Sequence, residues 1–246
     1  MRFFIKLSYK GTNYHGWQVQ PNAKTIQQEV NKALSVILNE RIEVIGAGRT
    51  DKGVHAKKMF AHFDYYIDFE IQDLIFKLNS FLPGDITILD IFKVKDDANS
   101  RFDALSRTYQ YHIIHRKDSF NKNAYLIQKD LDLEAMNEAC QHIIGKQDFS
   151  SFSKANSQTF TNDCDVMLAN WELVDYGLVF TIKSNRFLRN MVRAIVGTLI
   201  DIGFGKISAD NLISIIAAKD RSVSGASVPA CGLFLIDVEY SKQIVI

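Results

Sequence analysis

Prolines, cysteines and long apolar runs are all scarce in this chain of 246 residues. Three prolines are too few for a long disordered segment. No stretch approaches the roughly 18 apolar residues of a membrane-spanning helix, and charges interrupt the first residues, which is unlike a signal peptide. The three cysteines, Cys140, Cys164 and Cys231, are isolated and odd in number, so we expect neither a disulfide framework nor a zinc site. These absences favour a soluble protein in a reducing, cytoplasmic setting.

The chain also lacks a surplus of charge of one sign. Its formal net charge is +1, whereas proteins that bind nucleic acid usually carry a basic surplus. A near-neutral total permits a local basic cleft that acidic surface elsewhere balances, but it does not argue for one. Hydrophobic residues at 47% and charged residues at 23% are ordinary for a globular protein, and the length suits one large domain or two of ordinary size.

The hydrophobic periodicity follows one order in both halves of the chain. Side chains alternate where strands are expected and recur at helical spacing where helices are expected, and Thr25 to Gln28 looks like a capping box. The predicted strands cover about residues 5–9, 42–45, 58–66, 86–94, 107–115, 166–174, 178–184 and 232–240, and the predicted helices about residues 26–37, 70–80, 132–144, 187–202 and 209–218. Each half is therefore βαββαβ, the ferredoxin-like order. We predict an α+β protein of two domains, residues 1–104 and 105–246.

The segment from Gly46 to Ala56 carries most of the chemistry. It leaves a predicted strand, contains three glycines, and holds four functional side chains, which are Arg49, Asp51, Lys52 and His55. A tight turn is an equally good local interpretation, because Asp-Lys-Gly favours turns by itself. A phosphate-binding loop is a poor one: the third glycine of a dinucleotide fingerprint is missing, and Val54 stands where a P-loop has lysine.

Asp51 is the one carboxylate of this segment. Arg49 and Lys52 flank it, and nearby cations favour the charged form of an acid. An ionised carboxylate beside a sugar can attack as a nucleophile, stabilise an oxocarbenium-like centre, or take a proton. An ordinary glycosidase usually needs two carboxylates, and the segment has no evident second one.

The stretch from Gly48 to Ala56 resembles the catalytic motif of the TruA family of tRNA pseudouridine synthases. Further segments resemble other signatures of that family, in the same order and over nearly the whole chain. They are Tyr9–Pro21 followed by Thr25–Gln27, Arg101–Ala104 with Arg107–Tyr111, Asp148–Phe152, Phe187–Gly197, and Pro229–Leu233. Six matches in register are highly specific.

The resemblance implies a fold and a reaction. The family has two α+β halves joined through one extended, mostly antiparallel sheet with a central cleft. Its reaction breaks the bond between ribose C1′ and uracil N1, rotates the base and rejoins it through C5, with no cofactor and no metal. Its members act on positions 38 to 40 in the anticodon stem-loop of tRNA, as homodimers that hold one tRNA across both subunits.

The resemblance also implies roles for individual residues. Asp51 corresponds to the essential catalytic aspartate, either as covalent nucleophile or as base. Tyr109 should lie over the target uracil, Arg193 should pair with Asp51, and Arg49 should help to extract the base from its stack. The remaining residues expected to bind RNA are Lys52, His55, Arg107, Tyr111, Arg186 and Arg189.

Two patterns bear on these roles independently. Along the predicted helix 187–202 and the residue before it, Arg186, Arg189 and Arg193 fall at i, i+3 and i+7 and should share one face. Such a row suits a phosphate-lined cleft, although a solvated face is the commoner meaning of a charge row.

The second pattern is in the strand that begins at Arg107. Arg107, Tyr109 and Tyr111 should point to one side of it. An arginine beside aromatic rings resembles a platform on which RNA bases stack. Ordinary core packing is the alternative, because tyrosine is common in half-buried strands.

The sequence departs from the family pattern at Ala98, where an aromatic residue is usual, and at Val228, where alanine is usual. Neither position is catalytic.

Two other functions compete with the enzyme. A non-catalytic RNA-binding protein could share the fold, although intact catalytic positions argue against it. A nucleoside glycosidase would need a second carboxylate, for which Asp103 is the nearby candidate.

Overall fold

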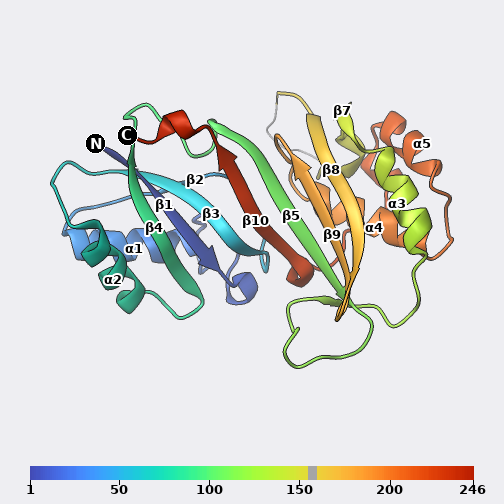
Figure 1. Ribbon diagram of the computed structural model, residues 1–246, viewed down its shortest axis with the longest axis horizontal. Coiled ribbons are helices and arrows are strands. Elements are labelled where there is room, and N and C mark those ends of the chain that lie inside the picture. The colour runs from blue at the N-terminus through green and yellow to red at the C-terminus, as the bar shows by residue number, and fades with distance from the viewer. Residues whose placement is uncertain (155–159) are drawn as a thin grey trace. The chain divides into compact units, whose positions relative to one another are not determined.

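The computed structural model describes residues 1–154 and 160–246, which form two compact units. Unit 1 consists of Met1–Leu105 together with Phe234–Ile246, and unit 2 of Ser106–Leu233. The last strand therefore belongs to unit 1, whereas the division drawn from the sequence placed it in the second half. The strands of both units are mostly antiparallel and alternate with helices (Figure 1), so the predicted α+β class is confirmed.

Unit 1 is a small sheet covered by two helices. Its elements are β1 (Arg2–Tyr9), α1 (Ile26–Leu38), β2 (Ile45–Gly46), β3 (His55–Asp64), α2 (Ile71–Phe81), β4 (Ile86–Val94) and β10 (Leu233–Tyr240). The strand order is β4-β1-β3-β10, in which β1 runs antiparallel to both neighbours and β10 runs parallel to β3. The central strand β1 is apolar on both faces and buries Phe4, Ile5 and Leu7 completely.

The start of α1 follows from its sequence. Thr25 is the N-cap, and its side chain accepts a hydrogen bond from the backbone N–H of Gln28 at 3.4 Å, as the capping signal predicts. Ile26, Val30 and Leu34 then recur on one face and are fully buried. The helix ends at Asn39, which takes the left-handed conformation that asparagine tolerates, with φ at 52°. Local chemistry thus fixes both ends of this helix.

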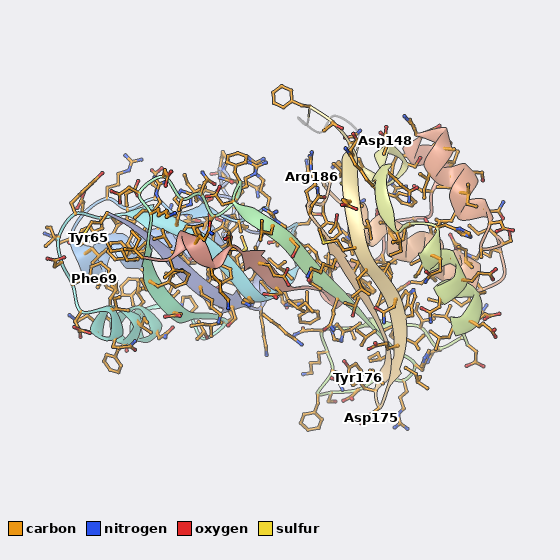
Figure 2. All side chains as sticks on the ribbon, turned by 45° about the horizontal axis from the view of Figure 1, so that its top comes forward. Tyr65, Phe69, Asp148, Asp175, Tyr176 and Arg186 are labelled. Carbon is orange, nitrogen blue, oxygen red and sulfur yellow. The ribbon has the colours of Figure 1, made fainter. Side chains whose placement is uncertain are left out.

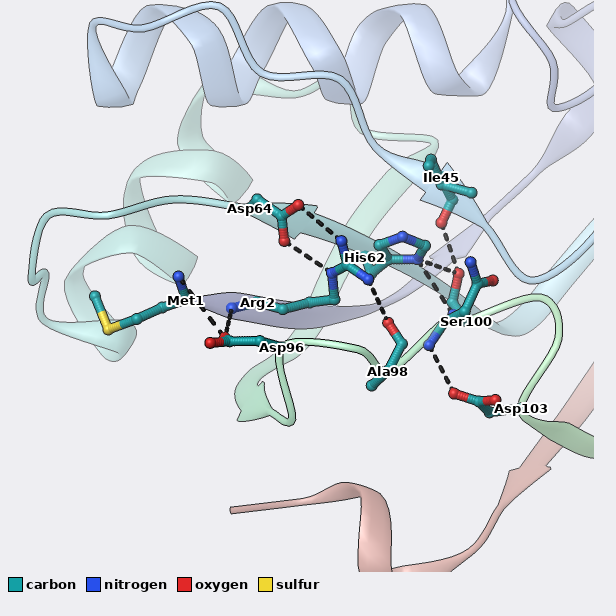
Figure 3. Close-up of polar contacts among 10 residues, drawn as sticks. Met1, Arg2, Ile45, His62, Asp64, Asp96, Ala98, Ser100 and Asp103 are labelled. Carbon is teal, nitrogen blue, oxygen red and sulfur yellow. Dashed lines mark hydrogen bonds and ion pairs between the residues drawn. The ribbon is translucent and has the colours of Figure 1, made fainter.

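A polar network joins β1, β3 and the segment after β4 in unit 1 (Figure 3). The Arg2 guanidinium donates to both carboxylate oxygens of Asp64 at 2.8 Å and to the Ala98 carbonyl at 2.9 Å. Beside it, His62 is buried, and its Nδ1 lies 2.9 Å from the Ser100 hydroxyl. Burial, and then the charge of Arg2, lower the pKa of His62 to about 4, so its ring is neutral near pH 7.

Unit 2 has the same layered plan. Its elements are β5 (Ala104–Ile114, which begins at the end of unit 1), β6 (Tyr125–Leu126), α3 (Leu133–Gln141), β7 (Gly145–Asp148), β8 (Asp163–Val174), β9 (Gly177–Ser184), α4 (Met191–Gly203) and α5 (Asn211–Ala218). The strand order is β5-β9-β8-β7, and α3 packs against both β8 and α4 (Figure 1). Tyr111, Phe180 and Trp171 stand opposite one another on three adjacent strands and form the centre of this core.

Helix α4 differs from its prediction in start and in burial. The apolar spacing predicted a helix from residue 187, but α4 begins at Met191, because Asn190 takes a left-handed conformation with φ at 68°. It is also buried on nearly every side, so that among its residues only Arg193 and Asp201 are partly exposed. Throughout the described residues, no helix is long and apolar enough to cross a membrane.

Candidate active site

Asp51 lies in the loop that links β2 to β3 in unit 1, here called the Asp51 loop (residues 46–56). The backbone N–H of Val54 donates to the Asp51 carbonyl at 3.1 Å, and Gly53 between them has φ at +82°. Such a φ favours glycine. The tight turn and the functional motif are therefore the same structure. The turn leaves Asp51 partly exposed, and the cations on either side of it in the sequence, Arg49 and Lys52, are exposed.

The N-terminal signature (residues 9–21) holds the Asp51 loop in place. Gly53 N–H donates to the Tyr14 carbonyl at 3.3 Å, and Trp17 N–H donates to the Thr50 carbonyl at 3.2 Å. Gly16 has φ at +88° and lies where a Cβ would overlap the Thr50 carbonyl oxygen. Two motifs that are far apart in the sequence thus build one backbone structure around Asp51.

Buried hydroxyl groups reinforce this contact. The Thr50 and Tyr9 hydroxyls share a hydrogen bond of 2.9 Å in the interior. The Tyr14 hydroxyl donates to the Asp85 carboxylate, and burial together with this carboxylate raises the pKa of Tyr14. Trp17 is 1% exposed and packs beside Tyr9. These groups anchor the loop and are too deeply buried to contact a substrate.

His55 also supports the loop. Its side chain is 1% exposed, and its Nδ1 accepts a hydrogen bond from Gly11 N–H at 3.1 Å. The ring stacks on Phe234 with centroids 4.7 Å apart. The expectation that His55 contacts RNA directly is therefore corrected: a ring enclosed in this way positions the N-terminal signature against β3.

In unit 2, Tyr109 and Tyr111 have different environments although they lie two residues apart on β5. Tyr109 is partly exposed and meets Phe187 edge to face, with centroids 5.2 Å apart and an interplanar angle of 90°. Tyr111 is fully buried, and its hydroxyl donates to the Pro229 carbonyl at 2.8 Å. Burial raises the pKa of Tyr111. The stacking role expected for Tyr111 is therefore wrong, and core packing is its function; Tyr109 keeps an accessible ring.

Arg193 lies in the first turn of α4, where both its backbone and its side chain form hydrogen bonds with Val228. Its Nε donates to the Val228 carbonyl at 2.7 Å, and Val228 N–H donates to the Arg193 carbonyl at 3.2 Å. The Nε bond fixes the plane of the guanidinium. Arg193 is thus a partly exposed cation held in one orientation on an otherwise buried helix.

The predicted row of three arginines on one helical face is wrong. Arg186 and Arg189 belong to the extended segment before α4, so only Arg193 is helical. Arg186 lies near Asp148 at one end of the unit 2 strands, away from the turn at Asp175 (Figure 2). Arg189 is exposed, and Arg107 donates through Nη1 to the Asn185 carbonyl at 2.8 Å. Arg186 and Arg189 remain on unit 2, but they lie in the loop between β9 and α4 rather than on the helix.

The chain was compared with known proteins. A family described as tRNA pseudouridine synthase matches residues 139–241. A protein of Parabacteroides distasonis called tRNA pseudouridine synthase A is 47% identical over 99% of this chain and 97% of its own length. A protein of the same name in Bacteroides fragilis is 49% identical over 99% of this chain and 98% of its own length. Another in Caldicellulosiruptor bescii is 38% identical over 96% of this chain and 98% of its own length. This chain belongs to the TruA family of tRNA pseudouridine synthases.

The resemblance seen in the sequence motifs is therefore confirmed, and the likeness to TruA proteins spans both units. Among the residues that the structure describes, no group of three or more His, Cys, Asp or Glu side chains is arranged to hold a metal ion. The absence of a cofactor stays a prediction.

Sequence reasoning missed the residues that hold the start of α4. Ser227 and Val228 lie more than 25 positions beyond this helix start, yet they contact Asn190, its N-cap, and Arg193, and Arg221 in turn donates to Ser227. The surrounding segment is short and polar and has no periodicity. The one signal was Asn190 itself, since asparagine is among the few residues that take a left-handed conformation readily.

Proposed function

We propose that this chain converts uridine to pseudouridine at positions 38, 39 and/or 40 in the anticodon stem-loop of tRNA, with Asp51 as the catalytic residue. Membership of the TruA family gives the class of enzyme, a tRNA-modifying isomerase. The positions and the residues are the proposal. The observation that carries it is the Asp51 loop, whose backbone is held by hydrogen bonds to the N-terminal signature while Asp51 itself stays partly exposed.

The chemistry needs an ionised carboxylate and no net gain or loss of atoms. The C1′–N1 bond breaks, the uracil rotates, a C1′–C5 bond forms, and the proton on C5 leaves while N1 gains one. Asp51 serves this sequence either by bonding to carbon or by taking a ribose proton. In both routes a rigid loop is an advantage, because the carboxylate must meet one atom of the sugar or base in one geometry.

Tyr109 and Arg193 are proposed to act on the same uridine. Tyr109 presents an accessible ring supported by Phe187, which suits stacking on an extruded base. Arg193 presents a charge whose orientation is fixed by Val228. Arg49 and Lys52 beside Asp51, and Arg107, Arg186 and Arg189 in unit 2, supply cations for the phosphate backbone.

We also propose that the enzyme is a homodimer that binds tRNA in the cytoplasm. Static light scattering of the active enzyme, with and without tRNA, tests the dimer. A mass of one chain under conditions of full activity would refute it.

The decisive experiment measures tritium release from tRNA that carries tritium at uridine C5. Rejoining through C5 must expel this tritium, whereas binding or glycosidic hydrolysis need not. We expect release by the wild type, and none by Asp51→Ala or by Asp51→Asn, which keeps the size of the side chain but not its charge. Both variants should still bind tRNA in a filter assay. Transcripts in which position 38, 39 or 40 alone is uridine would assign the sites.

Other outcomes would support the competing functions. Bound tRNA without release by the wild type would make the chain a non-catalytic RNA-binding protein. Liberation of free uracil would indicate a glycosidase, whose second carboxylate would be Asp103. The structure gives Asp103 a local role instead, since its carboxylate accepts the Asn99 N–H at 2.7 Å. Tritium release by Asp51→Ala would show that the reaction is pseudouridine formation but that Asp51 is not its catalytic residue.

A further inference from the structure

The segment of residues 220–229 runs beside the start of α4 and is organised by one arginine. Arg221 donates from Nη1 to the Ser224 hydroxyl at 2.8 Å and from Nη2 to the Ser227 hydroxyl at 2.9 Å. Its guanidinium is partly buried, and no carboxylate pairs with it in the part of the chain that the structure describes. A cation held by two serine hydroxyls, rather than by an acid, is placed for geometry rather than for charge neutralisation.

The Ser227 hydroxyl links Arg221 to the helix start. It accepts a second hydrogen bond, from Nδ2 of Asn190, at 2.5 Å. Asn190 is the residue whose left-handed backbone begins α4, and its own side chain makes no capping bond to the helix. The fork of Arg221 therefore holds Ser227, and Ser227 holds the turn from which α4 emerges.

The residue after Ser227 completes the link to Arg193. The Val228 carbonyl accepts from Arg193 Nε at 2.7 Å, and Val228 N–H donates to the Arg193 carbonyl at 3.2 Å. Asn190 and Arg193 are three residues apart at the helix start, so the two contacts of the 220–229 segment bracket one turn. A shift of Ser227 would move both the turn and the acceptor that orients the Arg193 guanidinium.

We propose that Arg221 is a positioning residue for pseudouridine formation, which acts by holding Ser227 and thereby fixing the orientation of Arg193. This inference depends on the proposed role of Arg193 in the reaction. Arginine suits the task because its planar guanidinium can reach two hydroxyls at once in a fixed fork. Lysine has three donors on one freely rotating nitrogen and lacks this planar fork, so it would hold the two hydroxyls less rigidly.

The test compares Arg221→Gln and Arg221→Lys with wild type by kcat and KM in the tritium-release assay. We expect Arg221→Gln to lower kcat about tenfold or more, because small errors in the placement of a catalytic group are costly. KM for tRNA should stay within about twofold, since a residue that acts only through Ser227 contributes no substrate contact. Arg221→Lys should fall between the two. Arg41→Gln removes one exposed cation that pairs with Glu43 and is the control for net charge.

A double-mutant cycle separates positioning from general structural support. Arg193→Lys keeps the charge but lacks the Nε donor, so it breaks the bond to Val228 by itself. In that background, Arg221→Gln should lower kcat little further, as expected for two residues in one chain of contacts. An equal fold-loss in both backgrounds would overturn the proposal, because it would show that Arg221 does not act through Arg193.

Three further outcomes would also overturn the inference. The first is that Arg221→Gln raises KM, leaves kcat unchanged, and lowers the slope of tRNA binding against salt by about one. Arg221 would then be a phosphate contact. The second is that Arg193→Ala is fully active. Arg193 would then have no role in the reaction, and both its proposed role and this inference would fail. Loss of kcat in Arg193→Ala but not in Arg221→Gln would overturn the inference alone.

A pair of variants at Ser227 keeps the test available if Arg221→Gln does not fold. Ser227→Ala removes the hydroxyl that Arg221 and Asn190 share, whereas Ser227→Thr retains it. We expect Ser227→Ala to lower kcat with little change in KM and Ser227→Thr to recover most of the loss. Equal kcat in both variants would show that the hydroxyl link has no role in the reaction.

Discussion

Gly16 lies directly against the carbonyl oxygen of Thr50, at a point where any side chain on residue 16 would overlap it. The hydrogen bond from Trp17 N–H to the same oxygen holds the two segments together. Thr50 immediately precedes Asp51, so the path of the N-terminal signature determines the path of the Asp51 loop. The signature therefore has a physical reason: it supports the backbone that carries Asp51, the proposed catalytic residue.

Gly16→Ala should consequently damage both stability and activity. Its φ of +88° strains any L-residue, and its Cβ would also stand 3.1 Å from the Asp51 carbonyl carbon. We expect a loss of about 1–3 kcal/mol in the free energy of unfolding and a fall in kcat larger than the change in KM. Urea denaturation and tritium release measure the two. Gly84→Ala is the matched control, because a Cβ there meets nothing within 4 Å; equal losses in both variants would contradict the argument.

The assignment of Tyr111 on β5 to the core, and not to RNA binding, can be tested by mutation. Tyr111→Phe removes the hydroxyl that donates to the Pro229 carbonyl and leaves the ring in its buried place. We expect the free energy of unfolding to fall by about 1 kcal/mol and KM for tRNA to stay unchanged. Tyr109→Ala should act in the opposite sense, with little effect on stability and a large loss of kcat. A raised KM in Tyr111→Phe would restore the RNA contact that the burial of Tyr111 rules out.

The comparison of these two tyrosines shows what periodicity can predict. The alternation of β5 correctly placed Tyr109 and Tyr111 on one face, because strand geometry is local. It could not predict that the segment around Pro229 covers one ring, since that contact spans more than 100 residues of sequence. The turn at Asp51 and the cap at Thr25 were predictable because the hydrogen bonds that form them join residues only three positions apart.

The start of α4 shows the same limit. Residues 187–190 continue the apolar spacing of the helix, so periodicity alone extended it backwards and placed Arg186 and Arg189 on it. The left-handed turn at Asn190 is held from outside by Ser227. Contacts of this kind give no sequence pattern, and they are the part of the candidate site that needed the structure.

His62 should make the stability of unit 1 sensitive to mild acid. Its pKa is lowered to about 4, from a usual value near 6.5, by burial and then by Arg2. The unfolded chain therefore takes up a proton more readily than the folded one between these values, so stability is full above about pH 6.5 and falls as the pH drops toward 4. The expected loss is about 1.4 kcal/mol per pH unit in this window. The lowered pKa of Asp64, which Arg2 causes, adds a loss at still lower pH.

Urea unfolding at pH 7 and at pH 5 measures this effect. His62→Asn cannot take up the proton and should lose much less stability between the two pH values than wild type, whatever its stability at pH 7. His15→Asn, at an exposed histidine, should keep the wild-type pH dependence. If wild type and His62→Asn lose stability equally, the acid sensitivity has another source.

The exposed cations of unit 2 should make tRNA binding depend on salt despite the net charge of +1. Each phosphate contact releases counterions, so the logarithm of the binding constant falls linearly with the logarithm of the salt concentration. Arg189→Gln should weaken binding for every tRNA alike and reduce that slope by about one, because Arg189 is exposed and belongs to the loop before α4. Arg41→Gln should leave the slope unchanged, since Arg41 pairs with Glu43. An unchanged slope in Arg189→Gln would show that this loop does not bind the phosphate backbone.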